Sequence, residues 1–518
     1  MEQFELIAKT FQGLEEVLAQ ELTELGANDI QIGRRMVSFT GDKEMMYRAN
    51  FCLRTAVRVL KPIKHFKAAD ADDVYNAVRA IDWSLYLDLD TTFAVDTVVY
   101  SQEFRHSKFV AYKVKDAIVD YFREKTGQRP NIRITNPDIK LNMHVAEDQC
   151  TLSLDSSGDS LHLRGYRVAS VDAPINEVLA AGLIKLTGWK CDTDFIDPFC
   201  GSGTILVEAA LMAHNIYPGI FRKSFGFEKW KDFNRDLLDH IYNDDSAERD
   251  FQHKIYGYDL NLRAVEAAQA NAKSAGMAGC ITVEQREMKK FTQPASPALI
   301  VTNPPYGERL VTPDLLGLYR TIGERLKHEF SGGEAWIISY RQECFDEIGL
   351  KPSFKVPLFN GSLDCEFRKY QLFSGKLDDF RAAGGEVKTT EERTRMAEKK
   401  RFKQHRGEFN GRFAENQESN RRHDNEDYNP EYELLRRKHR DFQERFNRGE
   451  RNERQEKPGR RENGERGTRR TTEWKNFDRR GGEHRGNGFR AETRNNRKSS
   501  FKGGERRGGR RDFGKRDE

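Results

Sequence analysis

Two short motifs, about a hundred residues apart, hold the side chains that could do chemistry. Residues 195–205 read FIDPFCGSGTI, and residues 299–306 read LIVTNPPY. In each, an apolar run typical of a β-strand stops at residues with special geometry. The first ends in a Gly-Ser-Gly turn that opens a helix, where backbone can approach a ligand closely. The second ends in a stiff Asn-Pro-Pro-Tyr turn that presents an amide, carbonyls and an aromatic ring. A ligand pocket beside such a turn indicates methyl transfer to a planar amine.

The glycine motif predicts a cofactor loop, and its context narrows the choice of cofactor. Gly201 and Gly203 lack the third glycine of the dinucleotide fingerprint, and no Gly-Lys-Ser/Thr ending follows. A second short strand, Ile255–Asp259, ends in an acid, which in a doubly wound sheet is where ribose hydroxyls are held. A glycine loop together with an acid at the end of the next strand favours an adenosyl cofactor. Two alternatives stay open: glycines that serve only packing, and Asp259 as the N-cap of the helix that follows.

The Asn-Pro-Pro-Tyr turn is the more specific motif. An exocyclic amine on a base is a poor nucleophile, because its lone pair is delocalised into the ring. The Asn303 side-chain carbonyl and the Pro304 backbone carbonyl are two acceptors that could align such an amine. Tyr306 offers a stacking face, worth roughly 1–3 kcal/mol. If the methyl donor is a sulfonium, proximity and alignment of the two reactants supply much of the rate acceleration. The alternative is a structural Pro-Pro exit from a buried strand.

The chain resembles a known family, the S-adenosylmethionine-dependent RNA methyltransferases that carry a THUMP domain. It is most similar to the bacterial type that methylates guanine N2 in large-subunit ribosomal RNA. Two residues depart from the family pattern, since Leu163 and Asn176 stand where basic side chains are expected. The likeness covers roughly Met1 to Ser374, and it is carried by both motifs and by Ala8–Glu16, Leu22–Ala27, Leu161–Arg167, Ala173–Glu177 and Gly307–Leu310.

The resemblance implies an α/β fold with three folded parts, and the scarcity of aliphatic residues after them predicts a disordered tail as a fourth. An N-terminal ferredoxin-like α+β domain is expected over residues 1–56 and a THUMP RNA-binding domain over 57–157. A Rossmann-like methyltransferase domain over 165–375 and a disordered, charged, Arg/Gly-rich tail over 377–518 follow. Strands that alternate with helices in the third part predict a mainly parallel sheet, with the site at the carboxyl ends of its strands. The aromatic-rich insert Phe221–Lys254 either packs beneath the site or contacts substrate.

The motifs and the resemblance together give three sets of expected site residues. Those expected to bind S-adenosylmethionine are Pro174, Asp197, Pro198, Cys200, Gly201, Ser202, Gly203, Thr204, Asp259 and Glu287, the last at the adenine edge. Those expected to hold the target base, as the catalytic set, are Asn303, Pro304, Pro305 and Tyr306. Those expected to contact RNA are Arg105, Lys108, Lys113, Arg164 and Arg167. For the first three of these, a solvated helix face is the alternative.

Charge is distributed unevenly along the 518 residues, although the formal net charge is only +5. Residues 377–518 carry about 41 Lys and Arg against about 29 Asp and Glu, a net charge of about +12. The residues before them therefore carry about −7. Any RNA face on the folded part has to be a local patch, whereas the Arg-Gly-Gly units and spaced aromatics of the tail suit loose, salt-sensitive RNA contact. A merely solubilising tail is the alternative.

Cysteine usage and the absence of targeting segments indicate the compartment. The seven cysteines are scattered, with no Cys-x-x-Cys and no histidine cluster, so neither a metal site nor a disulfide framework is expected. Cys200 serves as a small residue of the cofactor loop, because amine methylation needs no covalent intermediate. The sequence shows no signal segment and no run of about 18 apolar residues. We expect a cytoplasmic monomer that uses no membrane and no metal.

Three functions are compatible with the sequence. The first is methyl transfer to guanine N2 of RNA, with 23S ribosomal RNA or a pre-ribosomal particle as partner. The second is a non-catalytic RNA-binding or ribosome-assembly factor, against which the intact Asp197 and Asn303 count. The third is methylation of another exocyclic amine, in tRNA guanine or at adenine N6, since Asn-Pro-Pro-Tyr serves any such amine. The THUMP-like half and the Arg-Gly-Gly tail favour RNA.

The uneven charge gives a prediction about RNA affinity. Truncation after Lys376 removes the positive part of the chain, so RNA binding should weaken and its dependence on salt should become shallower, because fewer counterions are released. The modified position and the maximal rate should stay unchanged. Salt titrations of RNA binding, with and without the tail, measure both slopes. Equal slopes would mean that the tail does not touch RNA.

Overall fold

The computed structural model describes residues 2–104, 106–294, 297–307, 313–330 and 332–373, together with residues 375, 380 and 382. Three predictions lie outside these residues: the RNA contact by Arg105, the end of the resemblance at Glu308–Leu310, and, apart from residues 380 and 382, the 377–518 tail. Within the described part of the chain, no helix is long and apolar enough to cross a membrane.

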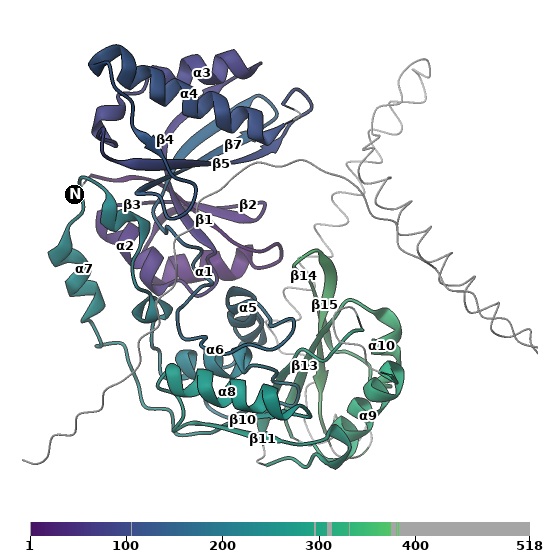
Figure 1. Ribbon diagram of the computed structural model, residues 1–518. Helices are drawn as coiled ribbons and strands as arrows, with labels where there is room; N and C mark the ends of the chain where they lie inside the picture. Colours follow the sequence, from purple (N-terminus) through teal and green to yellow (C-terminus); the bar gives the residue numbers. More distant parts are fainter. Residues whose placement is uncertain are drawn as a thin grey trace, which may run out of the picture. The chain divides into compact units, whose positions relative to one another are not determined.

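The N-terminal half is built on one eight-stranded sheet of order β2-β3-β1-β4-β8-β7-β5-β6 (Figure 1). The two small units expected from the sequence share it, because β4 pairs with β1 on one side and with β8 on the other. The strands are β1 (Phe4–Lys9), β2 (Asn28–Gly33), β3 (Met36–Gly41), β4 (Arg58–Lys67), β5 (Thr92–Tyr100), β6 (Asn131–Ile132), β7 (Ile139–Ala146) and β8 (Gln149–Asp155).

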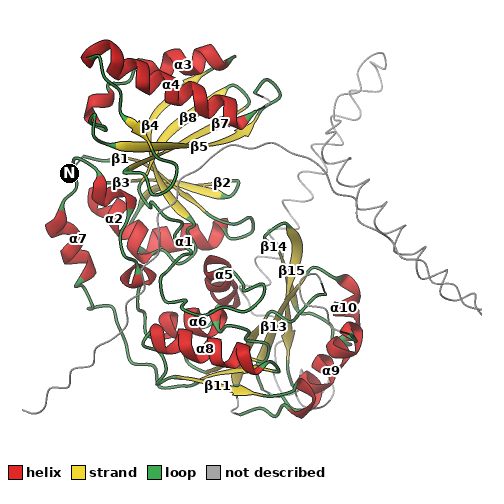
Figure 2. Ribbon diagram, viewed as in Figure 1, coloured by secondary structure: helices red, strands yellow, loops and turns green. Residues whose placement is uncertain are grey.

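Three helices of this half have a recognisable cap at one end. Asp42 and Asp70 accept hydrogen bonds from the first backbone N–H groups of α2 and α3, which satisfies donors that have no partner inside the helix. Helix α4 ends at Gly127, whose φ of 72° is the left-handed conformation that glycine adopts without strain. Figure 2 shows α3 and α4 covering the β4–β8–β7–β5 part of the sheet. The helices are α1 (Glu15–Glu24), α2 (Lys43–Cys52), α3 (Ala71–Arg79), α4 (Ser107–Thr126) and the 3₁₀ turn η1 (Trp83–Leu85).

The second half is built on a seven-stranded sheet of order β11-β10-β9-β12-β13-β15-β14. Its first five strands are parallel, and β15 runs antiparallel to both of its neighbours, β13 and β14. With β9 between β10 and β12, the residues that follow these three strands meet at one edge of the sheet. The strands are β9 (Asp194–Asp197), β10 (Ile255–Asp259), β11 (Ile281–Gln285), β12 (Ala298–Thr302), β13 (Glu334–Ser339), β14 (Phe354–Asn360) and β15 (Leu363–Gln371).

Helices cover both faces of this sheet. One buried apolar cluster joins one face to α5, α6 and α8, through side chains such as Leu179 and Leu206. A second joins the other face to α9 and α10, through side chains such as Ile322 and Phe345. The three layers confirm the expected Rossmann-like α/β fold. The helices are α5 (Glu177–Thr187), α6 (Thr204–Ala213), α7 (Arg235–Tyr242), α8 (Leu262–Ser274), α9 (Leu315–His328) and α10 (Gln342–Glu347), with 3₁₀ turns η2 (Pro218–Phe221), η3 (Gly226–Lys229) and η4 (Met288–Lys290).

The aromatic insert after α6 packs away from the expected site. Phe225, Phe227 and Trp230 are buried in the same apolar cluster as the side chains of the N-terminal sheet. The rings of Tyr47 and Phe227 stack with their centroids 4.0 Å apart and 11° between their planes. These aromatic side chains therefore pack against the N-terminal half and not beneath the site, and substrate contact by the insert stays a prediction.

Candidate active site

A cavity of about 1160 Å³ lies at the carboxyl edge of the seven-stranded sheet. Pockets for drug-sized ligands commonly have about 300–1,000 Å³, so this one has room for a nucleoside-sized ligand and a second planar group. All fourteen expected cofactor and catalytic residues except Gly203 line it. The wall also includes Ala169–Ala173, Ile175, Leu260, Asn261, Met288, Asn360 and Leu363, none of which was among the expected site residues.

Asp197, the last residue of β9, is fully buried at the floor of this cavity. Its Oδ1 accepts hydrogen bonds from the Thr302 hydroxyl at 2.6 Å and from the Phe199 backbone N–H at 3.1 Å. Its Oδ2 is buried and has no hydrogen-bond partner among the described residues. Burial raises the pKa of Asp197 to about 7. The free oxygen is therefore an acceptor that a ligand in the cavity can satisfy.

The loop from β9 to α6 exposes backbone to the cavity. Gly201 has a φ of 52°, and a Cβ placed on it would meet open space. Gly203 has a φ of 77°, and a Cβ there would lie 2.9 Å from the Cβ of Ala268. The second glycine is thus required by the close packing of α8, and the first leaves the loop open to a ligand. Cys200 is buried, and burial raises the pKa of its thiol well above the usual value, which keeps it out of nucleophilic chemistry.

Asp259, the last residue of β10, faces the same cavity. Its Oδ2 accepts from the Gly201 backbone N–H at 3.0 Å, and its Oδ1 from the Asn261 backbone N–H at 2.8 Å. Burial raises the pKa of Asp259 above its ordinary value. The N-cap of α8 is Asn261, whose side chain accepts from the Arg263 N–H. The capping alternative for Asp259 therefore falls away, and backbone N–H groups hold its carboxylate at the cavity wall, where the sequence predicted a contact with ribose hydroxyls.

The Asn-Pro-Pro-Tyr turn follows β12 and forms another part of the wall. The Tyr306 hydroxyl donates to Oδ1 of Asn303, and it accepts from Nδ2 of Asn360 at 3.0 Å. The Tyr306 ring is buried and meets the Tyr340 ring edge to face, with centroids 5.7 Å apart. The oxygen expected to receive the substrate amine thus holds the Tyr306 hydroxyl in this structure. A base meets both side chains only after that hydroxyl turns away from Asn303.

Two of the expected RNA-binding residues are held by partners inside the protein: Arg164 is buried and Arg167 is half-buried. The side chain of Arg164 is 1% exposed; it donates to the backbone carbonyls of Leu161 and Arg54 and pairs with Glu208 at 3.4 Å. RNA cannot reach it, so the prediction for Arg164 is wrong. The guanidinium of Arg167 pairs with Glu177 and donates to the hydroxyls of Ser202 and Thr204, so its donors are used inside the protein in this structure.

The other described RNA-binding candidates lie on α4. Lys108 is exposed, and the Lys113 ammonium lies 2.6 Å from Oδ1 of Asp72. Both candidates therefore lie on one helix, and the charge of Lys113 is paired with an acid. Asn176, where a basic residue was expected, caps α5 by accepting from the N–H groups of Val178 and Leu179.

The residues present fit an adenosyl cofactor. Asp259 supplies acceptors for ribose hydroxyls, and Leu260, 68% exposed beside it, supplies apolar surface. Glu287 lies in the wall after β11, where the sequence predicted an adenine contact. Asp197 offers its free oxygen near the glycine loop. Among the described residues, no group of three or more His, Cys, Asp or Glu could hold a metal ion.

Family descriptions match three consecutive parts of the chain. Residues 5–60 match the "RlmL ferredoxin-like domain", residues 68–155 the "THUMP domain" and residues 164–369 the "RMKL-like, methyltransferase domain". The protein slr0064 of Synechocystis sp., whose name calls it an RNA methyltransferase, is 38% identical over 369 residues, which are 71% of this chain and 96% of that protein.

Solved structures share the fold at similar identity. SMU.472, described as a methyltransferase complexed with SAH, is 31% identical with a TM-score of 0.66, over 73% of this chain and 100% of that one. A protein from Listeria monocytogenes, named for N6-adenine-specific DNA methylation, is 32% identical with a TM-score of 0.65, over 72% and 97% of the two chains. The cofactor of the cavity is therefore S-adenosylmethionine.

The position of Asp259 gives a prediction about cofactor binding. Asp259→Ala removes the acceptors for ribose and for the Gly201 N–H, so S-adenosylmethionine should bind at least about tenfold more weakly, or about 1.4 kcal/mol. Asp259→Asn keeps one acceptor oxygen, so its affinity for S-adenosylmethionine should lie between those of the wild-type chain and Asp259→Ala. Calorimetry on the purified chains measures the affinities, and circular dichroism checks the fold. Unchanged affinity in a folded Ala variant would refute the ribose assignment.

The buried Asp197 predicts how stability depends on pH. Its folded pKa of about 7 lies above the unfolded value of about 3.9. The folded state therefore holds more protons between these values, and ionisation of Asp197 costs stability as pH rises through the window. Relative to Asp197→Asn, the wild-type chain should lose up to about 1.4 kcal/mol per pH unit between about pH 4 and 7.

Urea unfolding of both chains at several pH values from 4 to 8 tests this expectation. The exposed Asp90→Asn is the matched control, because it makes the same chemical change outside the cavity. Its stability should run parallel to that of the wild-type chain. If the Asp197→Asn curve also runs parallel, the Asp197 carboxyl titrates normally and its second oxygen is hydrated.

Proposed function

Since the chain belongs to the THUMP-containing, RlmL-like family of S-adenosylmethionine-dependent RNA methyltransferases, we propose that it methylates the exocyclic N2 amine of a guanine in RNA. The proposed substrate is large-subunit (23S) ribosomal RNA or a pre-ribosomal particle. The proposal goes beyond the family in naming the base, the atom and the RNA.

The observation that carries the proposal is the position of Asn303 in the cofactor cavity. Thr302 and Asn303 are consecutive, and Thr302 is hydrogen-bonded to Asp197 at the base of the cofactor loop. A planar amine held by Asn303 therefore lies in the same cavity as the cofactor. S-adenosylmethionine supplies a methyl group on a sulfonium, which makes alignment more important than a strong base.

We assign separate tasks to the members of the turn. The Asn303 side-chain carbonyl and the Pro304 backbone carbonyl each accept one hydrogen of the amine, which leaves its lone pair for the methyl group. The Tyr306 hydroxyl leaves Asn303 when the base enters and keeps its bond from Asn360. The Tyr306 ring then offers a face to the base, a contact worth roughly 1–3 kcal/mol.

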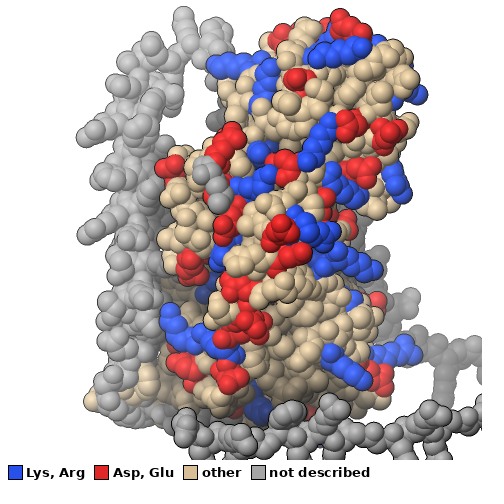
Figure 3. Space-filling model, turned by 90° about the vertical axis from the view of Figure 1, so that its left-hand side faces the viewer, with Lys and Arg blue, Asp and Glu red and all other residues tan. Residues whose placement is uncertain are grey.

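The N-terminal half supports RNA as the substrate. On α4, Phe109 and Tyr112 are 52% and 57% exposed, and the ammonium groups of Lys113 and Lys115 lie 5.8 and 5.1 Å from the centroids of these rings. Aromatic rings beside lysines suit stacking and phosphate contact. On the face drawn in Figure 3, basic and acidic side chains are interspersed, so local patches such as this one have to make the contact.

A second candidate is methylation of adenine N6. The Listeria structure that shares this fold is named for that reaction on DNA, and the Asn-Pro-Pro-Tyr turn accepts either amine. Nucleoside mass spectrometry separates the two. RNA from cells that lack the gene is digested and compared with RNA from cells that carry it. Loss of N2-methylguanosine from ribosomal RNA supports the proposal, and loss of N6-methyladenosine supports the second candidate.

The role of Asn303 is tested by substitution. Asn303→Ala removes an acceptor that aligns the amine, so turnover should fall by at least about a hundredfold while cofactor affinity stays unchanged. Tyr306→Ala should weaken base engagement, and Tyr306→Phe should be milder because the stacking face is kept. Single-turnover methylation and calorimetry measure the two quantities.

A matched control is Asn243→Ala, an exposed asparagine at the end of α7 that lies outside the cavity. It should leave both turnover and cofactor affinity as they are. If Asn303→Ala instead abolishes cofactor binding, the residue belongs to the cofactor site and the proposed alignment is wrong.

A further inference from the structure

One wall of the cofactor cavity has no helix or strand of its own. Residues 169–175 all line the cavity, and they run irregularly between the junction at Arg167 and the start of α5. Ala173 has a φ of 55°, a left-handed conformation that costs a non-glycine residue about 1–2 kcal/mol. Such a segment keeps one shape only if contacts from other elements hold it.

Asn271, on α8, makes the first of these contacts. Its side chain is buried. Oδ1 accepts from the backbone N–H groups of Val168 at 2.8 Å and Ala169 at 3.0 Å. Nδ2 donates to the backbone carbonyls of Ala169 at 2.8 Å and Ser202 at 2.9 Å. One amide thus uses its two donors and two acceptor sites to join the wall segment to the cofactor loop.

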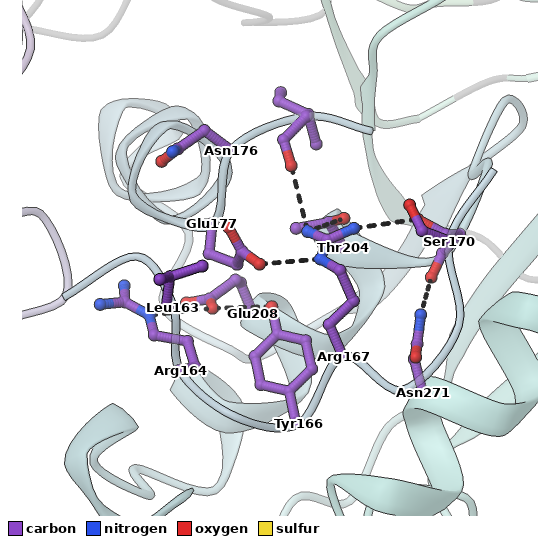
Figure 4. A network of polar contacts seen from close by, with 12 residues as sticks. Leu163, Arg164, Tyr166, Arg167, Ser170, Asn176, Glu177, Thr204, Glu208 and Asn271 are labelled. Atoms are coloured by element: carbon purple, nitrogen blue, oxygen red, sulfur yellow. Dashed lines mark hydrogen bonds and ion pairs between the residues drawn. The ribbon is translucent and has the colours of Figure 1, made fainter. Parts of the chain in front are cut away.

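Arg167 makes the second contact, at the base of the segment (Figure 4). Its Nη2 donates to the Ile175 carbonyl at 3.2 Å, which brings the two ends of the wall together. The same guanidinium donates to the hydroxyls of Ser202 at 3.1 Å and Thr204 at 2.9 Å. Its Nε pairs with Glu177 at 2.8 Å. Only a planar fork of donors reaches these four acceptors at once, so lysine cannot replace it.

Neither side chain lines the cavity. Both bind the wall segment and the glycine loop at the same time, so they set the distance between two surfaces that a cofactor has to contact. Neither motif contains them: Asn271 is a polar residue inside an ordinary helix, and Arg167 lies in the junction between the two halves of the chain.

We propose that Arg167 and Asn271 are positioning residues for S-adenosylmethionine. They hold residues 168–175 against the glycine loop in the shape that encloses the cofactor, and they act through backbone and hydroxyl groups, not through the reacting atoms. The inference rests on the cofactor site of the proposed function and is independent of which base receives the methyl group.

The test compares Asn271→Ala with Gln269→Ala on the same helix. The side chain of Gln269 donates to the Val283 carbonyl at 3.0 Å and makes no hydrogen bond to residues 168–175. Gln269→Ala therefore also removes an amide-to-backbone hydrogen bond, but one that does not hold the wall segment. We expect Asn271→Ala to weaken binding of S-adenosylhomocysteine, measured by calorimetry without RNA, by about tenfold or more. Gln269→Ala should leave it unchanged. At saturating cofactor, turnover of Asn271→Ala should recover to within about twofold of the wild-type value.

Hydrogen exchange supplies a readout that needs no activity. In the cofactor-free protein, the N–H groups of Val168 and Ala169 should exchange faster in Asn271→Ala than in Gln269→Ala, because their acceptor is gone. Saturating S-adenosylhomocysteine should slow them again. If Asn271 served only global stability, Asn271→Ala would instead lower the unfolding midpoint and leave the affinity for S-adenosylhomocysteine at the value of Gln269→Ala. That result would overturn the proposal.

Arg167→Lys decides the matter if Asn271→Ala does not fold. It keeps the charge beside Glu177 but loses the fork that joins Ile175 to Ser202 and Thr204. We expect a similar loss of cofactor affinity with unchanged RNA affinity. Wild-type affinity in a folded Arg167→Lys chain would refute the proposal. Because all these measurements use cofactor binding, an error in the assigned base does not affect them.

Discussion

One buried hydrogen bond, from the Thr302 hydroxyl to Asp197, connects the two halves of the site. The parallel register of β9 and β12 brings these residues together, since Ala298 pairs with Asp194 and Ile300 with Ile196. The same Asp197 oxygen accepts from the Phe199 backbone at the start of the cofactor loop. A single atom therefore fixes both the loop and the Asn-Pro-Pro-Tyr turn. Its fully buried surroundings make that geometry costly to change, because any movement would leave a further polar group without a partner.

The sequence was informative wherever the signal is local. Residues 195–204 and 299–306 have the required residue types within one strand and one turn, so the sequence predicted their place at the sheet edge correctly. The strand Ile255–Asp259 was predicted with the bounds that β10 has in the structure. In contrast, the union of two small units in one sheet depends on pairing β4 with β8, and periodicity carries no information about such distant partners.

Long-range partners also explain the errors at the site. Arg164 and Arg167 were interpreted as RNA ligands because they lie in Leu161–Arg167, one of the segments that carry the family resemblance. Their acceptors, Glu208 and the Ser202–Thr204 hydroxyls, come from about 35–45 residues downstream. No sequence pattern pointed to Asn271 or Asn360 as site residues. Their partners, the Ala169 backbone and the Tyr306 hydroxyl, are distant in sequence and come close only in the fold.

The insert that follows α6 constrains how the protein is made. A nascent chain that has emerged as far as Asp155 has all eight strands of its first sheet, but it lacks Phe227 and Ile241, which belong to the core of that half. Domains commonly fold as units in the order of their synthesis. Here the first unit stays incomplete on the ribosome until part of the second has been translated. We therefore expect a chain that ends at Asp155 to lack part of its own core, whereas a chain that continues through α7 contains all the buried residues of that core.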